Sequence, residues 1–437
     1  MGETTTRSPF QITSELKEVL DLLANHPPPV LFVTGSAGTG KSTLIQIIRQ
    51  QLRKNLAVVA PTGVAALRVG GQTIHAFFRF PAQPQPSPKK LHGESRRIIE
   101  GMDILVIDEV SMVRADLLDA IDASLRRNTE SGNVPFGGKT VLLVGDLHQL
   151  PPVVATDEEK RLFQEHYDSP FFFSAKCFRQ IQLVTKNLSK SFRQTDNTFI
   201  ELLNDIRVGR NLSESVEILN HSNEYMREEA MLILTTVNAK ARQYNEKQLH
   251  DIDQKEWCFE AELDGDWSER DDQLPAPKSL RLKKSAQVMF VKNGQEWVNG
   301  TVGRVVDLDD ESIEVELLSE PHKGTTVAVK RESWDRYQYK WNDKRGVIDV
   351  RTIGSYRQLP FILAWAVTIH KAQGLTLDDV NIDLGRGTFA PGQAYVALSR
   401  CRTMDGISFS RPLEIKDMLC DQRIIDFYSN VQFNKVA

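Results

Sequence analysis

The sequence predicts an α/β protein in which two parallel-sheet units flank a smaller, β-rich insertion. Apolar runs alternate with helical patterns through about the first 180 residues, and the same alternation resumes from Arg357. Between Trp257 and Val350 the strand-like pieces are short and separated by turn residues, as in a small β-barrel. Fully apolar strands separated by helices are typical of a parallel sheet covered on both faces, and functional groups gather at the carboxyl ends of such strands.

The first predicted strand leads into a glycine-rich loop. VLFVT at Val30–Thr34 precedes GSAGTGKS at Gly35–Ser42, which fits the phosphate-loop pattern G-x-x-x-x-G-K-[ST]. Glycines let the backbone approach a phosphate, amide N–H groups cradle it, and the N-terminus of the following helix favours negative charge. Lys41 would reach the β- and γ-phosphates, and the Ser42 hydroxyl would bind Mg²⁺. The residues predicted to bind nucleotide in this loop are Gly38, Thr39, Gly40, Lys41, Ser42 and Thr43.

Two further strands end in polar residues suited to nucleotide hydrolysis. Asp103–Glu109 is an apolar strand that ends in Asp108, which can hold Mg²⁺ through water, and Glu109, which can orient or deprotonate the attacking water. The segment Thr140–Val153 ends its strand in Gly-Asp, and Gln149 follows three residues later. Gln149 is interpreted as a sensor of the γ-phosphate, although the segment also reads as an ordinary strand before a proline turn.

The composition of the chain indicates an intracellular protein but does not identify what it binds. No apolar run reaches membrane-spanning length, and the N-terminus lacks the apolar core of a secretory signal. The four cysteines lack C-x-x-C spacing, which is typical of reduced thiols in an intracellular protein. A net charge of −4 does not by itself indicate a nucleic-acid-binding protein, but such a protein can confine its positive charge to one groove.

Six segments occur in an order that makes a family resemblance specific. They are GSAGTGKST, VIDEVSM, GDLHQLPPV, KSFRQ, TIHKAQGLTLD and QAYVALSR. Together they resemble the motifs of helicases of superfamily 1, group B, and are most similar to the PIF-type (petite integration frequency) DNA helicases. The segment Leu117–Gly138 resembles a signature of that family, and the resemblance spans about Val30 to Arg402.

The resemblance implies a domain organisation. It implies two RecA-like parallel-sheet domains, a small inserted β-barrel of SH3-like type and a short wedge insertion. On this basis residues 1–182 form the first RecA-like domain, with the wedge at about 79–100 around a proline-rich loop. Residues 183–255 and 352–437 form the second RecA-like domain, and residues 256–351 form the inserted β-domain.

The resemblance also implies further residues of the nucleotide site. Arg193 in SFRQ and Arg400 in ALSR match the two arginine fingers of the family, and Gly374 in KAQGLTL matches a backbone contact near the γ-phosphate. The family usually reads adenine with a glutamine near the N-terminus, where this chain has Leu16. Gln11, five residues earlier, is the candidate substitute.

Four segments of the chain match segments that contact single-stranded DNA in the family, and the resemblance implies the same contacts here. The candidates are Thr62, His75, Lys292, Asn293, His370 and Lys371. They would bind mostly phosphates and sugars, which gives affinity without sequence readout. His75 is alternatively a core histidine. The interleaved aromatic and basic residues of Arg331–Arg357 either stack bases or form an amphipathic strand of the small barrel.

The function implied by the resemblance is that of an ATP-dependent 5′-to-3′ DNA helicase with roles in DNA replication, repair or recombination, and in telomere maintenance. Its cofactors are ATP and Mg²⁺, its partners are single-stranded and forked or tailed duplex DNA, and it is monomeric when free and does not bind membranes. It would act in the cytoplasm of a bacterium or virus-infected cell, or in a eukaryotic nucleus or mitochondrion. The alternatives are a RecD-like helicase of the same group, a phosphate-loop ATPase switch without nucleic acid, and a DNA-binding scaffold with vestigial hydrolysis.

Overall fold

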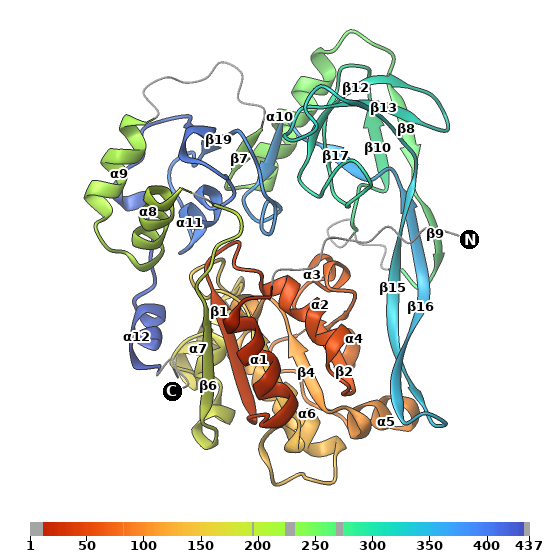
Figure 1. The fold of residues 1–437 in the computed structure, drawn as a ribbon, viewed down its shortest axis with the longest axis vertical. Helices are drawn as coiled ribbons and strands as arrows, with labels where there is room; N and C mark the ends of the chain where they lie inside the picture. Colours follow the sequence, from red (N-terminus) through yellow and green to blue (C-terminus); the bar gives the residue numbers. More distant parts are fainter. Residues whose placement is uncertain (1–11, 82, 195, 223–231, 268–273, 432–437) are drawn as a thin grey trace.

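The first domain is built on a six-stranded parallel sheet. The computed structural model of the protein describes residues 12–81, 83–194, 196–222, 232–267 and 274–431, and Figure 1 shows their arrangement. The strand order is β3-β2-β4-β5-β1-β6, and every neighbouring pair is parallel. This confirms the predicted α/β fold. The strands are β1 (Val30–Gly35), β2 (Leu56–Ala60), β3 (Gln72–Thr73), β4 (Ile104–Ile107), β5 (Thr140–Val144) and β6 (Leu183–Leu188).

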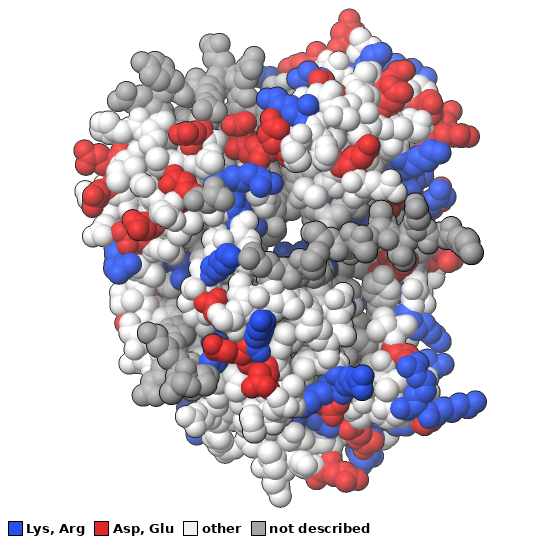
Figure 2. Space-filling view, in the orientation of Figure 1, with Lys and Arg blue, Asp and Glu red and all other residues white. Residues whose placement is uncertain are grey.

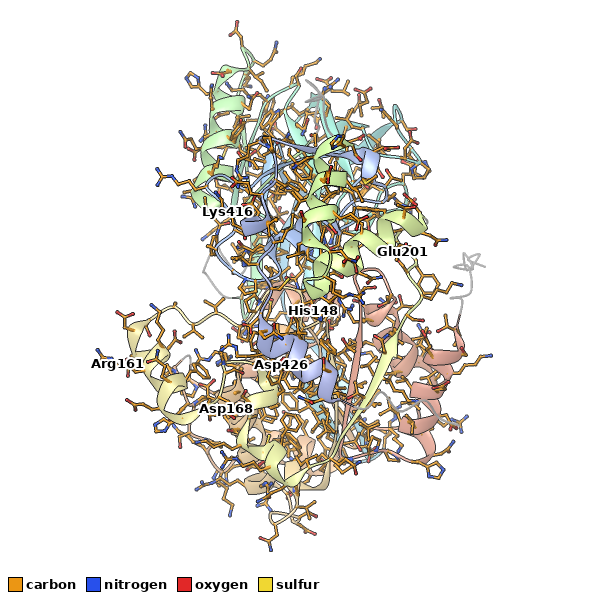
Figure 3. All side chains as sticks on the ribbon, turned by 90° about the vertical axis from the view of Figure 1, so that its left-hand side faces the viewer. His148, Arg161, Asp168, Glu201, Lys416 and Asp426 are labelled. Carbon is orange, nitrogen blue, oxygen red and sulfur yellow. The ribbon has the colours of Figure 1, made fainter. Side chains whose placement is uncertain are left out.

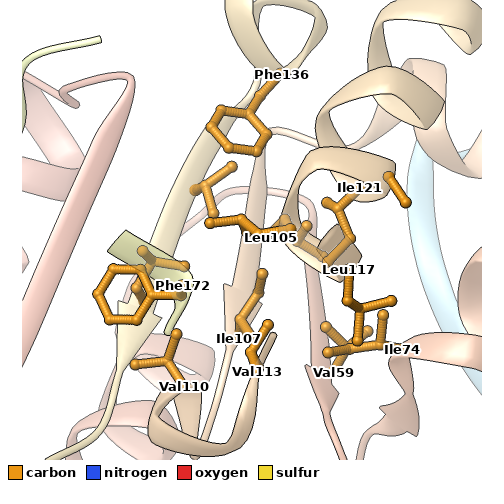
Figure 4. Packing of buried hydrophobic residues seen from close by; sticks show 14 of the residues in the cluster. Val59, Ile74, Leu105, Ile107, Val110, Val113, Leu117, Ile121, Phe136 and Phe172 are labelled. Carbon is orange, nitrogen blue, oxygen red and sulfur yellow. The ribbon is translucent and has the colours of Figure 1, made fainter. Parts of the chain in front are cut away.

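Helices cover both faces of this sheet because successive strand residues point to opposite sides. Leu105 and Ile107 pack into one core with Leu117 and Ile121 of a covering helix (Figure 4), whereas Val106 packs into the other core. Such alternation in strands that are buried on both faces explains their continuous apolar sequence. The helices of this domain are α1 (Ser14–Asn25), α2 (Lys41–Gln51), α3 (Gly63–Arg68), α4 (Ile74–Phe78), α5 (Gly93–Gly101), α6 (Ala115–Asn128) and α7 (Asp157–His166).

The second domain has a smaller parallel sheet in the order β18-β7-β19-β20. Its strands are β7 (Ile233–Thr235), β18 (Ala366–Thr368), β19 (Val380–Asp383) and β20 (Ile407–Phe409). Its helices are α8 (Asn197–Val208), α9 (Leu212–His221), α10 (Asn238–Asp251) and α11 (Gln393–Leu398). The last helix, α12 (Gln422–Asn430), returns to the first domain, where the Phe427 ring stacks on Phe173 with centroids 4.4 Å apart.

The inserted β-domain has a five-stranded antiparallel sheet in the order β14-β13-β12-β11-β17 and a two-stranded pair, β10-β8. They share one apolar core. Its likeness to an SH3 barrel stays a prediction. The strands are β8 (Trp257–Glu260), β10 (Ser279–Leu282), β11 (Gln287–Phe290), β12 (Val302–Leu308), β13 (Ile313–Leu317), β14 (Thr326–Val329) and β17 (Phe361–Leu363).

Two predicted domain boundaries separate strands from the sheets that they join. The boundary after residue 182 precedes β6, which pairs with β1 along its whole length and therefore belongs to the first sheet. The boundary after residue 351 cuts through a strand and excludes β17, which pairs with β11 of the inserted sheet. In both cases the sheet to which a strand belongs depends on pairing with a strand far away in the sequence, and the local sequence pattern does not predict that pairing.

A long hairpin joins the β-domain to the first domain. It consists of β15 (Glu332–Asn342) and β16 (Val347–Gln358), to which β9 (Glu262–Gly265) adds a third strand. In Figure 1 it runs down the side of the molecule from the β-domain to α5. The Trp341 ring lies directly on Gly101, where an added Cβ would come within 2.1 Å of it.

Tyr339 completes the edge of the first sheet. β3 pairs only with Val59 and Ala60, so the peptide groups of Val58 have no strand beside them there. The Tyr339 hydroxyl accepts a hydrogen bond from Val58 N at 2.8 Å and donates one to Val58 O at 3.0 Å. The aromatic and basic segment is therefore an amphipathic strand at Tyr339, as one alternative held, but it packs on the first domain and not only within the barrel.

No helix in the described part of the chain is long and apolar enough to cross a membrane.

We expect Tyr339→Phe to loosen the edge of β2, because it leaves the buried N–H and C=O of Val58 without partners at a cost of about 1–3 kcal/mol. Hydrogen exchange at the Val58 amide should be about tenfold faster or more. Tyr337→Phe, on the same strand, is the control and should leave this amide unchanged. Equal protection of Val58 in the Tyr339 variant and the wild type would contradict the assignment.

Candidate active site

The phosphate loop connects β1 to α2 and is shaped by its glycines. Gly38 and Gly40 have φ angles of 81° and 87°, in the left-handed region that other residues rarely adopt. The Lys41 ammonium donates hydrogen bonds to the carbonyl oxygens of Gly35 at 2.7 Å and Ser36 at 2.9 Å. These carbonyl groups hold the Lys41 ammonium against the loop, where it can pair with a bound anion.

Lys41 is half-buried, and its environment perturbs its protonation. Burial lowers the pKa of Lys41 to about 8, and the carboxylates of Asp146 and Glu109 only partly offset this effect. Thr39 lies in the same loop and is buried, and its hydroxyl donates to Ser36 O at 2.9 Å. Ser42 and Thr43 lie in the first turn of α2.

The two predicted carboxylates stand at the carboxyl end of β4. Burial raises the pKa of Asp108 to about 6, with a further contribution from the charge of Glu109. Glu109 adopts a left-handed backbone conformation with φ 49°. Its Oε1 accepts a hydrogen bond from Arg68 at 2.6 Å, and its Oε2 accepts one from Gln373 at 3.3 Å. Gln373 also donates to Gln149 Oε1 at 3.1 Å, which brings the predicted γ-phosphate sensor beside the carboxylate.

The segment that follows β6 carries Arg193 onto the phosphate loop. The amide of Phe192 donates to Gly38 O at 2.9 Å, and an added Cβ at Gly38 would lie 2.5 Å from the Cβ of Arg193. The Arg193 guanidinium donates to Ser399 O at 3.1 Å and to Gly374 O at 3.3 Å, both in the second domain. Arg193 therefore lies between the loop and the second domain.

Arg400 lies immediately after α11 and is buried. Its guanidinium donates to Val396 O and to the Ser399 hydroxyl, both at 2.8 Å. Burial lowers the pKa of Arg400 to about 10 and that of Arg193 to about 9, and the charge of Arg400 further lowers the latter. Among the residues that the structure describes, neither arginine forms an ion pair with a carboxylate. Together with Lys41 they create a positive site that suits a polyphosphate.

A buried ion pair holds the two domains together beside this site. Asp146, at the end of β5, pairs with Arg207 of α8 at 2.9 Å. The Tyr395 hydroxyl, from α11, donates to Asp146 at 3.3 Å and accepts a hydrogen bond from the Ala37 amide of the phosphate loop at 3.1 Å. Burial alone would raise the pKa of Asp146, but Arg207 and Lys41 hold it at about 2.

His148 and α12 extend this contact. The His148 ring stacks on Tyr428 with centroids 4.9 Å apart, and the Tyr428 hydroxyl shares a 2.7 Å hydrogen bond with Thr34 of β1. In Figure 3, His148 lies where the upper and lower parts of the molecule meet. The second domain therefore contacts the first through both α11 and α12.

Several predicted DNA contacts already have structural roles. Thr62 is the N-cap of α3 and accepts from the Ala65 amide at 3.2 Å. His75 is half-buried in α4, consistent with either alternative. Lys292 pairs with Glu332 at 2.9 Å, and the Asn293 side chain accepts from the Asn299 amide at 2.7 Å.

His370 and Lys371 are exposed and follow β18. In the view of Figure 2, the surface of the molecule is hollowed near its middle, between the first domain below and the second domain and β-domain above. DNA binding by the six predicted residues stays a prediction.

The predicted adenine reader is not located. Gln11 lies outside the described residues, and Leu16 is buried in the core between α1 and the sheet. Sequence reasoning missed Phe192, whose side chain is exposed although its ring lies 3.6 Å from where a Cβ at Gly40 would stand. It also missed Arg68, Gln373 and Tyr395; the last two lie inside recognised motifs, but Arg68 carries no sequence signal.

Comparisons with known proteins give the family to which the chain is similar. A family model described as PIF1-like helicase matches residues 11–217. The chain is 36% identical to the human ATP-dependent DNA helicase PIF1 over 92% of its own length and 61% of the relative. It is 33% identical to ATP-dependent DNA helicase Pif1 of Bdellovibrio bacteriovorus, covering 97% of this chain and 93% of that protein. The chain thus spans about three fifths of the length of the vertebrate relatives it matches.

Solved structures of Pif1 from Bacteroides sp. are similar over 96% of this chain. The complex with ADP-AlF4 has a TM-score of 0.87 at 33% identity and 97% coverage of that chain. The unliganded protein has a TM-score of 0.86, and the protein bound to single-stranded DNA has one of 0.67, both at 34% identity and 97% coverage.

We expect nucleotide affinity to fall as the pH rises through about 8, because the lowered pKa of Lys41 removes its charge above that value. Phosphate favours the charged ammonium, so binding must then add a proton and weakens about tenfold per pH unit. The dissociation constant of a non-hydrolysable ATP analogue, measured from pH 7 to 9, checks this. Lys41→Arg keeps its charge and should lack the decline, and an equal decline in both proteins would contradict the role of Lys41.

Proposed function

This chain belongs to the PIF1-like helicase family, and we propose that it is an ATP-dependent DNA helicase that moves 5′ to 3′ on single-stranded DNA and unwinds duplexes. The observation that carries the proposal is the composite site between two parallel-sheet domains. Lys41 and the two carboxylates come from one domain, and the buried Arg400 comes from the other. A site divided in this way can couple nucleotide turnover to domain movement.

In the proposed reaction each side chain has a separate task. The loop amides and Lys41 bind the phosphates, and Glu109 accepts a proton from the attacking water. Arg193 and Arg400 stabilise the charge that develops in the transition state, and they are already desolvated, which strengthens their effect. Gln149 and the Gly374 backbone border the γ-phosphate position.

The chemistry of the donor set fits Mg²⁺. Ser42 and Asp108 offer a hydroxyl and a carboxylate, which are the hard oxygen ligands that this ion prefers beside substrate phosphates. When bound, the ion neutralises phosphate charge. Burial and the charge of Glu109 raise the pKa of Asp108, so its carboxylate is disfavoured in the protein alone, and a cation bound beside it would favour the charged form.

Phe192 is proposed as the surface on which the base stacks. The residue is 46% exposed, and its ring lies beside Gly40 with the Lys190 ammonium 5.2 Å from its centroid. Stacking on an aromatic ring does not distinguish adenine strongly from other bases. The proposal therefore includes modest base selectivity, with Gln11 as an additional candidate.

The DNA would cross all three domains. Thr62 and His75 on the first, Lys292 and Asn293 on the β-domain, and His370 and Lys371 on the second are the proposed contacts. Residues 79–100 are proposed as the wedge that separates the strands. We also propose that the free protein is a monomer and that it acts inside the cell, where its DNA substrate lies.

The rival functions need fewer of these features. A phosphate-loop switch without nucleic acid would not need the inserted β-domain, and a scaffold with vestigial hydrolysis would not need two arginines that lie beside the phosphate loop without an ion pair among the described residues. A RecD-like helicase remains close in mechanism, but the family match favours the PIF type.

Unwinding of matched duplexes with a 5′ or a 3′ tail tests the reaction and its direction together. We expect ATP-dependent unwinding of the 5′-tailed duplex only. Lys41→Ala should lower the rate by about 100-fold or more while single-strand binding persists. Lys17→Ala, on the exposed face of α1, is the control. Unwinding that requires a 3′ tail, or turnover that DNA does not stimulate, would refute the proposal.

Phe192→Ala should raise the KM for ATP about fivefold or more with little change in kcat, because a stacking contact is lost from binding but not from hydrolysis. Phe389→Ala, which removes another exposed ring, should leave both constants unchanged. Steady-state ATP turnover at saturating DNA measures this. A fall in kcat without a change in KM would show that Phe192 serves hydrolysis instead.

A further inference from the structure

We infer that Arg68 and Gln373 are positioning residues that restrain Glu109 and make its action as a base depend on DNA. This inference rests on the proposed helicase function and names the contacts through which DNA would control hydrolysis. The observation behind it is that Arg68 and Gln373, which lie on the predicted DNA-contact segments of the first and second domains, both donate hydrogen bonds to the Glu109 carboxylate.

Both oxygens of Glu109 are engaged. Oε1 accepts a hydrogen bond from the Arg68 guanidinium at 2.6 Å, and Oε2 accepts one from the Gln373 amide at 3.3 Å. The carboxylate is largely buried, with 13% of its side chain exposed, so little water competes for these contacts. A charge-assisted hydrogen bond to a guanidinium is among the stronger contacts that a carboxylate makes.

Each partner lies on a segment that also carries predicted DNA contacts. Arg68 is the last residue of α3, and Thr62 is the N-cap of the same six-residue helix. Gln373 follows His370 by three residues and Lys371 by two. A helix this short moves as one body, so displacement of Thr62 by a bound strand would carry Arg68 with it.

The two segments also touch one another. An added Cβ at Gly374 would lie 2.2 Å from Nη1 of Arg68, so the guanidinium packs directly against the second domain. Gly374 has a φ angle of 85°, which fixes this close approach at a glycine. Movement of either domain along DNA would therefore alter the contacts at the carboxylate.

The restraint has a direct chemical consequence. A base must present a free oxygen to the water that it deprotonates, and an oxygen bonded to a guanidinium is both occupied and less basic. Arg68 also lies 3.5 Å from Asp108, so it holds the neighbouring carboxylate as well. Releasing Arg68 frees the base, and retaining it keeps hydrolysis slow.

The restrained arrangement is the one that resembles the DNA-free relative. This structure has a TM-score of 0.86 with unliganded Bacteroides Pif1 and of 0.67 with the DNA-bound form. The arrangement of domains in which Arg68 reaches Glu109 is thus more similar to the unliganded relative than to the DNA-bound one.

The test compares ATP turnover with and without saturating oligothymidylate in the wild type, R68Q, R68A and Q373A. We expect the DNA-independent kcat of the variants to rise about fivefold or more, the usual scale of a coupling between sites. The DNA-stimulated kcat should stay within about twofold, as for a change outside the reacting groups. The ratio of the two rates should therefore fall, and R68K, which keeps the charge, should restore most of it.

R49A is the matched control. Arg49 donates to Gly70 O at 3.0 Å, just beyond α3, and touches neither carboxylate. It should leave the ratio unchanged. Oligothymidylate affinity without ATP should match or exceed that of the wild type in every variant, because DNA no longer has to break the restraint. The melting temperature should match the wild type, which a general loss of structure would not allow.

Three outcomes would overturn the inference. The ratio could be unchanged in R68Q and R68A. Both rates could fall together, which would make Arg68 part of the hydrolytic machinery. A wild-type protein that DNA does not stimulate would instead overturn the proposed function and this inference with it, whereas a stimulated wild type with unchanged variants would overturn the inference alone.

Discussion

The ion pair between Asp146 and Arg207 is the contact on which the candidate site depends. The Asp146 side chain is fully buried and the Arg207 side chain is 14% exposed, so Asp146 without its partner would be costly to bury. Asp146 lies beside the phosphate loop, and Tyr395 extends the pair to the Ala37 amide within that loop. The pair therefore fixes where α11, and with it Arg400, stands relative to Lys41.

A second connection runs through the β15–β16 hairpin. Tyr339 supplies hydrogen bonds to the edge of β2 that a neighbouring strand would otherwise supply. The first domain is thus joined to the rest of the molecule on two sides, by α12 on one and by the hairpin on the other (Figure 1). A protein that changes its domain arrangement must break or move at least one of these contacts, and the hairpin contact is the farther from the nucleotide site.

The basic side chains of the site differ in whether a carboxylate of the protein neutralises them. Lys41, Arg193 and Arg400 have lowered pKa values, whereas Arg68 is paired with the carboxylates of Asp108 and Glu109. A polyphosphate would supply the negative charge that the first three lack. Lys41, Arg193 and Arg400 are therefore suited to binding a ligand, whereas Arg68 restrains Glu109, the proposed base.

The sequence by itself determined the phosphate loop, the carboxylates at the tip of β4 and the parallel sheets, because each depends on residues that are neighbours in the chain. It also placed Arg193 and Arg400, through their motifs. Only the tertiary structure decided that β6 and β17 join their sheets, that Tyr339 closes an edge and that Arg68 reaches Glu109. These depend on which distant segments pack together, and a lone arginine or a short strand carries no local pattern that names its partner.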